Sequence, residues 1–454
     1  MRRLLIANRG EIACRIIRSA RKLGISPVAV YSEADRGALH VEMADDAVEI
    51  GPPQAALSYL DASRIISAAN GMGADAVHPG YGFLAESADF ADAVLEAGLT
   101  WVGPSPETIR RMGDKQSARE TARSAGVPVL PGSARIRPGE VGALKKSAED
   151  VGLPLLVKAS AGGGGIGMRR VDAIDALEET VSSVQQGAEK AFGSGDVYLE
   201  RLVPRARHVE VQVFGFGDGT AMHLFERDCS LQRRFQKIIE EAPAPRLAEG
   251  TRRALHEASL ALCRQTKYSG AGTVEFVLDA ETGEYFFLEM NTRIQVEHPV
   301  SEMVTGVDLV AMQLELAGGA RPDAEVGGKP AGHAIECRLY AENPRKMFFP
   351  SPGRLERFVL PEEASDLRVE TGYREGDVVS PFYDPMIAKI IAHGTDRRAA
   401  VARSLQALNE TEVTGITCNR DFLVSCLRHD SFVSGDVHTG FIEEHRSALI
   451  PAAG

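Results

Sequence analysis

A run of glycines at 162–165, followed by Gly167, limits most what this chain can fold into, because strand-like runs at 155–159 and 168–171 flank it. Gly162, Gly164 and Gly167 formally match G-x-G-x-x-G, but a dinucleotide-binding loop follows the first strand directly and opens a helix. No Gly-Lys-Ser/Thr sequence follows, which excludes a Walker loop. The run therefore indicates a glycine hairpin whose N–H groups could cover nucleotide phosphates, or else a plain surface hairpin.

The pattern along the chain predicts an α/β protein of about three domains. Apolar runs at 4–7 and 28–31 flank a helical pattern at 12–23, which is typical of a βαβ unit. The alternation of helices and strands continues to about residue 113, with a helical pattern at 59–70. We expect domains at 1–113, 114–330 and 331–446, with the glycine hairpin in a small lid, 131–203, of the second domain.

Composition and charge indicate a soluble protein. The chain of 454 residues has no run of about 18 apolar residues that could span a membrane. Its net charge of -12 argues against nucleic-acid binding, which needs a basic face. The six cysteines show no zinc spacing, and the start of the chain lacks the pattern of a signal peptide, so we expect a cytoplasmic protein.

Two lysines lie where a nucleotide would be held beside the glycine run. Lys158 precedes the run on a predicted strand, and Lys115 ends the sequence Met-Gly-Asp-Lys. Each ammonium could contact a phosphate, and that of Lys158 could contact the adenine edge. A lone lysine is more often a solvated surface residue, so their position beside a phosphate-type loop carries this hypothesis.

The strongest signal is the sequence Glu-Met-Asn-Thr-Arg-Ile-Gln-Val-Glu-His at 289–298. In a strand, Glu289, Asn291 and Arg293 share one face at period two. Glu275 would lie on the partner strand of the same hairpin and add a second carboxylate.

Oxygen ligands of this kind suit Mg²⁺ that bridges ATP phosphates. The alternative is a solvated acidic sheet face. It is weakened because Glu275 and Glu289 interrupt apolar runs, where a buried charge needs a partner. The sequence therefore predicts a metal site on a β-hairpin, with its turn at 279–284.

With these residues identified, the chain resembles the biotin carboxylases of the ATP-grasp superfamily over essentially its whole length. The resemblance is carried by the glycine run and by the motifs Ala-Asn-Arg-Gly-Glu-Ile-Ala (7–13), His-Pro-Gly-Tyr-Gly-Phe-Leu (78–84), Glu-Arg-Asp-Cys-Ser (226–230), Glu-Glu-Ala-Pro-Ala-Pro (240–245), 289–299 and Tyr-Asp-Pro-Met (383–386). It implies a Rossmann-like N-terminal domain, an ATP-grasp domain (α+β) with a mobile glycine-loop lid, and a mixed α/β C-terminal domain. It also implies ATP-dependent carboxylation of carrier-bound biotin with bicarbonate, through carboxyphosphate.

The resemblance assigns roles to individual positions. ATP would be bound by Lys115, Lys158, Gly164, Gly165, Glu200, Arg201, Leu202, Val203, His208, Gln232, Glu275 and Glu289. Mg²⁺ or Mn²⁺ would be held by Glu275, Glu289 and Asn291. Bicarbonate would be bound by Lys237, Arg293, Gln295 and Val296, and biotin by Arg338 and Asp384. The implied catalytic residues are Arg293, Lys237, Arg338 and Glu297, the last as the base.

Two positions depart from the family pattern. Ile166 stands where a basic residue is usual before the last loop glycine, and Phe235 replaces the histidine of Arg-Arg-His-Gln-Lys. Both changes remove polar groups near the expected phosphates, so we expect weakened ATP binding. Arg201 in place of the usual lysine is a milder change, because contacts there are expected to come from the backbone.

The implied partners are a biotin carboxyl carrier protein or domain, a carboxyltransferase subunit and a second copy of the chain in a homodimer. No lysine lies in an Ala-Met-Lys-Met setting, so we expect a carrier outside these residues. The final acceptor would be acetyl-, propionyl- or methylcrotonyl-CoA, and the resemblance slightly favours methylcrotonyl-CoA.

Two alternatives to this function remain. One is another ATP-grasp ligase, such as a purine-pathway carboxylase or half of a carbamoyl-phosphate synthetase. The other is a non-catalytic assembly subunit, which Ile166 and Phe235 suggest. Retention of Lys237, Arg293 and Glu297 favours the enzyme.

Overall fold

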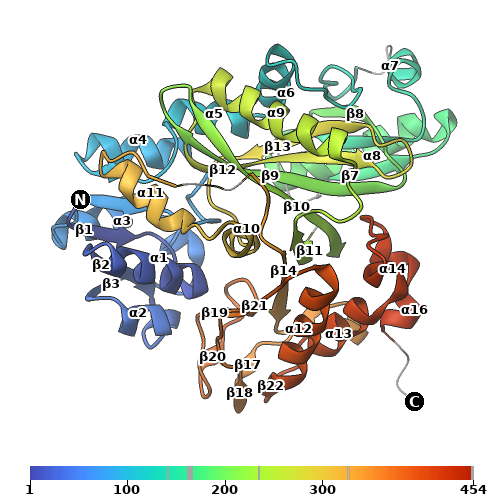
Figure 1. The fold of residues 1–454 in the computed structure, drawn as a ribbon. Helices are drawn as coiled ribbons and strands as arrows, with labels where there is room; N and C mark the ends of the chain where they lie inside the picture. Colours follow the sequence, from blue (N-terminus) through green and yellow to red (C-terminus); the bar gives the residue numbers. More distant parts are fainter. Residues whose placement is uncertain are drawn as a thin grey trace.

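The N-terminal part of the protein is an open parallel sheet with helices on both faces (Figure 1). The computed structural model describes residues 1–140, 142, 144–160, 167–233, 236–324, 326 and 328–450. In spatial order, the strands are β3 (Asp46–Gly51), β2 (Ser26–Ser32), β1 (Arg3–Ile6), β4 (Ala76–His78) and β5 (Thr100–Trp101). The helices are α1 (Gly10–Lys22), α2 (Leu39–Met43), α3 (Ala62–Gly71), α4 (Ala88–Glu96) and α5 (Pro106–Gly113). The expected βαβ beginning is confirmed.

The apolar run of β1 is continuous because helices cover both faces of its sheet. Leu4 and Ile6 lie in a buried cluster with Ile16 of α1. Leu5 points the other way and lies in a cluster with Phe90 of α4. Successive strand residues alternate between faces, so a strand buried on both sides must be apolar at every position.

The structure places the beginning of one predicted helix later in the sequence. The helical pattern at 59–70 becomes α3, which begins only at Ala62. The side chain of Asp61 accepts a hydrogen bond from the N–H of Arg64 and so caps the helix. The cap fixes the beginning that the apolar periodicity alone placed too early.

The predicted lid strands form a small antiparallel sheet with two covering helices. The order is β7 (Met168–Val171), β6 (Leu155–Ala159) and β8 (Val197–Arg201), with α7 (Leu144–Val151) and α8 (Leu177–Phe192). Both predicted strands are confirmed with the same bounds. The sequence predictions for Gly164, Gly165, Ile166 and Phe235 lie outside the described residues.

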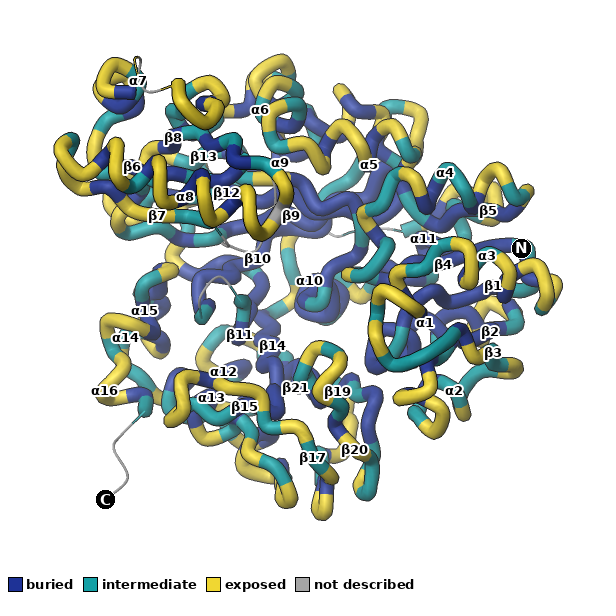
Figure 2. The backbone as a smooth tube through the Cα atoms, turned by 180° about the vertical axis from the view of Figure 1, so that it is seen from behind, coloured by how far each residue is buried: buried dark blue, intermediate teal, exposed yellow. Residues whose placement is uncertain are grey.

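A large antiparallel sheet of eight strands forms the centre of the molecule, and its strands are mostly buried (Figure 2). Its order is β13 (Tyr285–Asn291), β12 (Ser269–Asp279), β9 (Ala206–Phe216), β10 (Ala221–Arg233), β11 (Gln236–Ala242), β14 (His333–Tyr340), β21 (Met386–Gly394) and β19 (Leu367–Thr371). The expected turn between β12 and β13 is confirmed, because the N–H of Asp279 donates to the carbonyl of Glu284 at 2.8 Å.

The end of β13 corrects one sequence expectation. The strand ends at Asn291, so Glu289 and Asn291 share a strand face but Arg293 lies beyond it. The backbone turns after Asn291 towards α10 (His298–Thr305). Arg293 nevertheless reaches back, and its Nη2 donates to Oδ1 of Asn291 at 2.8 Å.

The large sheet continues across the predicted boundary at residue 331, since β14 pairs with β11. Helices of the middle part are α6 (Lys115–Ser124), α9 (Glu249–Thr266) and α11 (Leu309–Ala317). The C-terminal helices are α12 (Arg397–Glu410), α13 (Arg420–Arg428), α14 (Asp430–Val433), α15 (Phe441–Glu444) and α16 (Arg446–Leu449). Short strands pair as β15 (Glu342–Asn343) with β16 (Phe349–Pro350), β17 (Gly353–Arg354) with β20 (Val378–Val379), and β18 (Arg357–Val359) with β22 (Glu412–Thr414). Within the described ranges, every helix is too short or too polar to cross a membrane.

Candidate functional site

A cavity of about 540 Å³ lies between the lid sheet and the large sheet. Its lining includes residues from β6 and β8 of the lid and from β9, β12 and β13 of the large sheet. The predicted site residues that line it are Lys115, Lys158, Glu200, Arg201, Leu202, Val203, His208, Gln232, Lys237, Glu275, Glu289, Asn291, Arg293, Gln295, Val296, Glu297 and Arg338. The fold therefore brings into one space residues that lie as far apart in the sequence as Lys115 and Arg338.

At the lid end of the cavity, Glu200 is held by two cations. Its Oε1 pairs with the ammonium of Lys158, and its Oε2 accepts from Nη1 of Arg119 at 2.7 Å. Arg119, on α6, also donates to the carbonyl of Leu130 at 2.6 Å. Lys115 lies on the same helix, and burial together with Lys158 lowers its pKa. Lys115, Lys158 and Arg119 make this end cationic, as an anionic nucleotide would require.

At the other end, Lys237 is surrounded by three buried carboxylates. Its ammonium lies 2.6 Å from Glu210, 2.9 Å from Glu275 and 2.7 Å from Glu297. Burial alone would lower the pKa of this lysine, but the carboxylates raise it well above its usual value. Lys237 therefore stays charged and favours the ionised form of Glu275 and Glu297.

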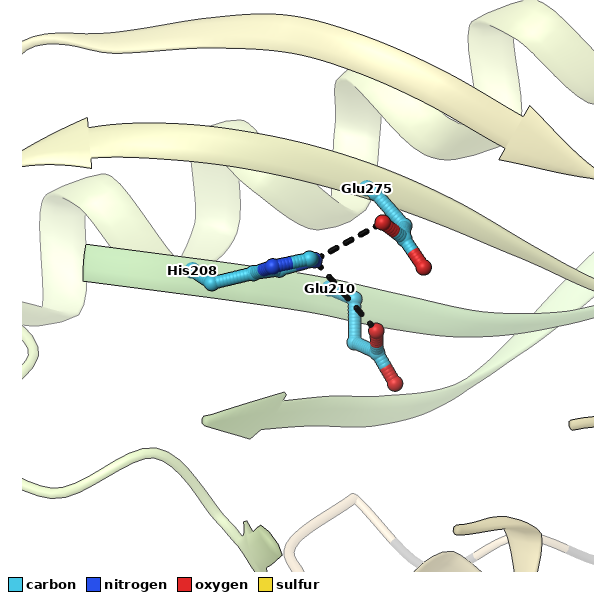
Figure 3. Close-up of side chains that lie close together, drawn as sticks. All are labelled: His208, Glu210 and Glu275. Atoms are coloured by element: carbon cyan, nitrogen blue, oxygen red, sulfur yellow. Dashed lines mark ion pairs between the residues drawn. The ribbon is translucent and has the colours of Figure 1, made fainter. Parts of the chain in front are cut away.

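Glu275 is the most heavily contacted of these acids. Its Oε1 accepts from Asn291 and Gln295, each at 2.8 Å, in addition to Lys237. Its Oε2 lies 2.8 Å from Nε2 of His208, and Figure 3 shows that imidazole pointing towards both Glu275 and Glu210. Burial opposes the charge, but Lys237 and His208 lower the pKa of Glu275 well below its usual value. Glu275 is therefore a permanent anion.

Glu289 completes an oxygen-rich face that fits a divalent cation. It lies directly opposite Glu275 across β12 and β13. Desolvation within the cavity raises the pKa of Glu289, and the charges of Glu275 and Glu86 add to this rise. This repulsion marks unbalanced negative charge, and a hard cation between carboxylate and amide oxygens would relieve it. Glu275, Glu289 and Asn291 are the residues that could hold such an ion.

Two other acid-containing clusters lie nearby, namely His208 with Glu210 and Glu275, and Glu210 with Cys229 and Glu297. Both include carboxylates that already contact the Lys237 ammonium. That ammonium supplies the positive charge there.

Arg338 extends the charge network from β14 into the cavity. Its Nη2 donates to Oε2 of Glu297 at 2.9 Å and forms an ion pair with Glu240 at 2.5 Å. Its buried Nε has no acceptor among the residues that the structure describes. Leaving a buried donor without a partner costs free energy, so this N–H could donate to an oxygen of a bound molecule.

Arg293 and Asp384 are placed less centrally. Nε of Arg293 lies 3.0 Å from the carboxylate of Glu86. Asp384 is exposed, accepts from the N–H of Met386 at 2.9 Å, and is not among the described residues that line the cavity. Its proposed contact with biotin would therefore lie outside this cavity.

The sequence predictions missed four residues of this site: Arg119, Glu210, Arg227 and Glu240. Arg227 is fully buried, and its donors reach Glu210, Gln212, Thr273, Gln295 and Ser301 at 2.6–3.1 Å. Its bond to Gln295 fixes the amide so that Nε2 faces Glu275. A signal existed for Glu210, because the sequence His-Val-Glu-Val-Gln-Val at 208–213 places polar residues on one strand face.

Three family models match the chain in order. They are "Biotin carboxylase, N-terminal domain" at residues 1–109, "Carbamoyl-phosphate synthase L chain, ATP binding domain" at 114–324, and "Biotin carboxylase C-terminal domain" at 336–444.

Characterised relatives match over nearly the whole chain. Biotin carboxylase 1 of Bacillus subtilis is 48% identical over 450 residues, covering 98% of this chain and 99% of the relative. The mitochondrial methylcrotonoyl-CoA carboxylase subunit alpha of Glycine max is also 48% identical, but this chain spans only 61% of its length.

Among solved structures, the biotin carboxylase domain dimer of Hydrogenobacter thermophilus 2-oxoglutarate carboxylase, in complex with MgADP, ADP and bicarbonate, has a TM-score of 0.93. It is 42% identical and covers 100% of this chain and 99% of that one. The Campylobacter jejuni biotin carboxylase structure has the same TM-score at 41% identity, covering 98% of this chain and 99% of that one. From its sequence, its three-domain fold and these relatives, the chain belongs to the biotin carboxylase family.

Proposed function

We propose that this chain uses ATP to carboxylate carrier-linked biotin with bicarbonate. The single observation that carries the proposal is Glu297, a carboxylate only 2% exposed between Lys237 and Arg338. It lies in the same cavity as the cationic lid end and the oxygen-rich face of Glu275 and Glu289. A base, cations for an anionic substrate and a nucleotide site thus share one enclosed space.

Glu297 would act as the general base. Burial disfavours its charge, but Lys237, Arg338 and Arg227 lower its pKa well below its usual value, so it is ionised before bicarbonate arrives. Such a low pKa makes a weak base. Bicarbonate and phosphate would compete for Lys237 and Arg338, and the pKa of Glu297 would rise as they do so. Glu297 could then take the bicarbonate proton as a bicarbonate oxygen attacks the γ-phosphorus and ADP leaves.

The two ends of the cavity would hold the nucleotide. Lys158 and Glu200 would lie at the adenine, and Lys115 would contact phosphate. A Mg²⁺ or Mn²⁺ ion held by Glu275, Glu289 and Asn291 would offset charge on the phosphates. Gln295, fixed by Arg227 and Glu275, would orient bicarbonate together with Arg293 and the backbone of Val296.

Arg338 would receive biotin. The unpaired Nε of Arg338 offers a donor to the ureido oxygen, where negative charge develops when the ring nitrogen loses its proton. Breakdown of carboxyphosphate to CO₂ and phosphate in the closed site would supply both the electrophile and the acceptor of that proton. Asp384 would contact biotin outside the cavity.

The partners of this activity are part of the proposal. A biotin carboxyl carrier and a carboxyltransferase would complete an acyl-CoA carboxylase in the cytoplasm, and the chain would form a homodimer. Methylcrotonyl-CoA is the favoured acceptor, but this half-reaction ends at carboxybiotin. The carboxyltransferase therefore selects the acceptor, which agrees with relatives named for several different acceptors at 41–49% identity.

ADP release with and without bicarbonate and free biotin tests the proposed function. We expect ADP release to require bicarbonate and to rise on addition of biotin, with formation of carboxybiotin. ADP release that requires bicarbonate but does not rise on addition of biotin would favour another ATP-grasp ligase. No ADP release under any of these conditions would favour a non-catalytic subunit.

A further inference from the structure

A pair of buried glutamates lies behind Arg338 and has no part in the mechanism above. Glu240 on β11 and Glu336 on β14 are directly opposite each other, and both are 0% exposed. Directly paired residues of neighbouring strands point to the same face, so their carboxyl groups are close. Neither oxygen of Glu336 has a hydrogen-bond partner among the residues that the structure describes.

One nitrogen of Arg338 is shared between two carboxylates. Its Nη2 lies 2.5 Å from Oε1 of Glu240 and 2.9 Å from Oε2 of Glu297. Glu297 loses its charge when it takes a proton. Glu240 lies on β11, the strand paired with β14, and contacts no substrate in the proposed reaction. The guanidinium therefore has two carboxylate partners. The charge of Glu297 changes during turnover, whereas that of Glu240 need not change.

The surroundings favour a single negative charge on the glutamate pair. The pKa of Glu240 is raised to about 7, because burial and the charge of Glu297 outweigh Arg338 and Lys237. Burial raises the pKa of Glu336 as well, and the charge of Glu240 adds to this, against Lys389 and Arg338. Several charged and titratable groups face the pair. They are Arg338, Cys337 and Tyr340 on β14, Lys389 on β21, Cys229 on β10, Lys237 on β11 and Glu297 before α10. Two adjacent buried carboxyls do not both ionise, and Arg338 draws the charge to Glu240.

We infer that Glu240, backed by a neutral Glu336, is a positioning residue that keeps one anion on Arg338 while Glu297 carries the bicarbonate proton. Without Glu240, Arg338 would lose its second carboxylate at that stage and would turn towards phosphate instead of biotin. This inference rests on the proposed function, because it concerns the step in which Arg338 meets biotin.

Three variants separate positioning from a structural role. Glu240→Gln removes the charge, Glu240→Asp keeps it on a shorter side chain, and Glu336→Gln mimics a neutral acid. We expect Glu240→Gln to lower kcat for biotin-dependent ADP release about ten- to a hundredfold, because the guanidinium of Arg338 would lose a charged partner that lies 2.5 Å away. The KM for ATP should stay unchanged, because Glu240 is not among the described residues that line the cavity and its ion pair is with Arg338, which would meet biotin. Glu336→Gln should keep the wild-type rate.

The pH profile gives the readout that a structural defect would not change. In the wild type, Glu240 is protonated as the pH falls through about 7, so the biotin-dependent rate should fall there. That limb should disappear in Glu240→Gln and return in Glu240→Asp. A wild-type rate and profile in Glu240→Gln, or an equal loss in Glu336→Gln, would overturn the inference.

An infrared measurement covers the case in which Glu240→Gln does not fold. We expect the wild type at neutral pH to show a band of a protonated carboxyl group that Glu336→Gln lacks, and the same band in both proteins would overturn the inference. If the wild type itself shows no biotin-dependent ADP release, the proposed function fails. If it does and Glu240→Gln matches it, only the role of Glu240 fails.

Discussion

At the scale of single residues, Lys237 provides a positive charge that an incoming anion can bind. One ammonium contacts Glu210, Glu275 and Glu297 within 2.9 Å. Breaking such a buried contact leaves an unpaired charge, so the arrangement is stable only while every member is present. A bound bicarbonate would replace one of the carboxylates as a partner of Lys237. The residue at which that exchange matters chemically is Glu297.

Glu297→Gln should lower turnover by roughly 10² to 10⁴, the range for a lost general base. Gln keeps the shape and can still contact Lys237 through its oxygen, so ATP binding should persist. Steady-state ADP release and a separate nucleotide titration measure the two quantities. Turnover close to that of the wild type would remove Glu297 from the mechanism.

Glu289→Ala should abolish Mg²⁺-dependent nucleotide hydrolysis without unfolding the chain. It removes one of two carboxylates that face each other across β12 and β13, and hard cations bind through such oxygens. Glu284→Ala is the matched control, because Glu284 is an exposed residue in the turn of the same hairpin. Hydrolysis measured over a range of Mg²⁺ concentrations decides the matter, and unchanged activity at low Mg²⁺ would contradict the metal role.

At the scale of elements, local patterns predicted strands well but not all of their ends or partners. The run at 155–159 is apolar except for Lys158, and β6 has the same bounds. The end of β13 before Arg293 was not predicted, because the sequence carries no turn signal at Thr292. Glu240 was missed because its role depends on β14, almost a hundred residues later in the sequence. Period-two patterns predict a face of a strand but not the strand beside it.

Arg119 belongs to the element scale because it joins α6 to the lid. It connects Glu200 of β8 with the carbonyl of Leu130 at 2.7 and 2.6 Å. Arg119→Met should raise the KM for ATP about tenfold and leave kcat nearly unchanged, because Glu200 would then bind only Lys158 and the adenine end would lose its geometry. Arg123→Met is the control, because Arg123 lies one turn later on α6 and its side chain is exposed. Equal KM values in wild type and Arg119→Met would contradict this role.

At the scale of the whole molecule, buried ion pairs connect the three parts of the chain. Lys389 of β21 is fully buried, and its ammonium lies 2.8 Å from Glu370, 3.4 Å from Glu11 and 2.7 Å from the carbonyl of Val296. It thus joins the C-terminal part to α1 and to the backbone of the proposed bicarbonate site. Arg15 of α1 pairs with Glu302 at 2.9 Å in the same way. Contacts this distant in sequence have no local signal, which is why the sequence did not predict them.

Close backbone contact between the first and last parts of the chain gives the final prediction. Gly372 lies against the beginning of α1, where an added Cβ would be 2.6 Å from backbone atoms of Gly10 and 2.7 Å from the nitrogen of Glu11. Backbone cannot yield as a side-chain end can, so Gly372→Ala should destabilise the protein by about 1–3 kcal/mol, the range for overpacking. Gly187→Ala is the control, because Gly187 is exposed within α8 with open space around it, and alanine there should stabilise by up to about 1 kcal/mol. Thermal unfolding of both variants beside the wild type should therefore move the midpoints in opposite directions. A Gly372→Ala midpoint at or above the wild-type value would show that the two parts of the chain do not pack this closely.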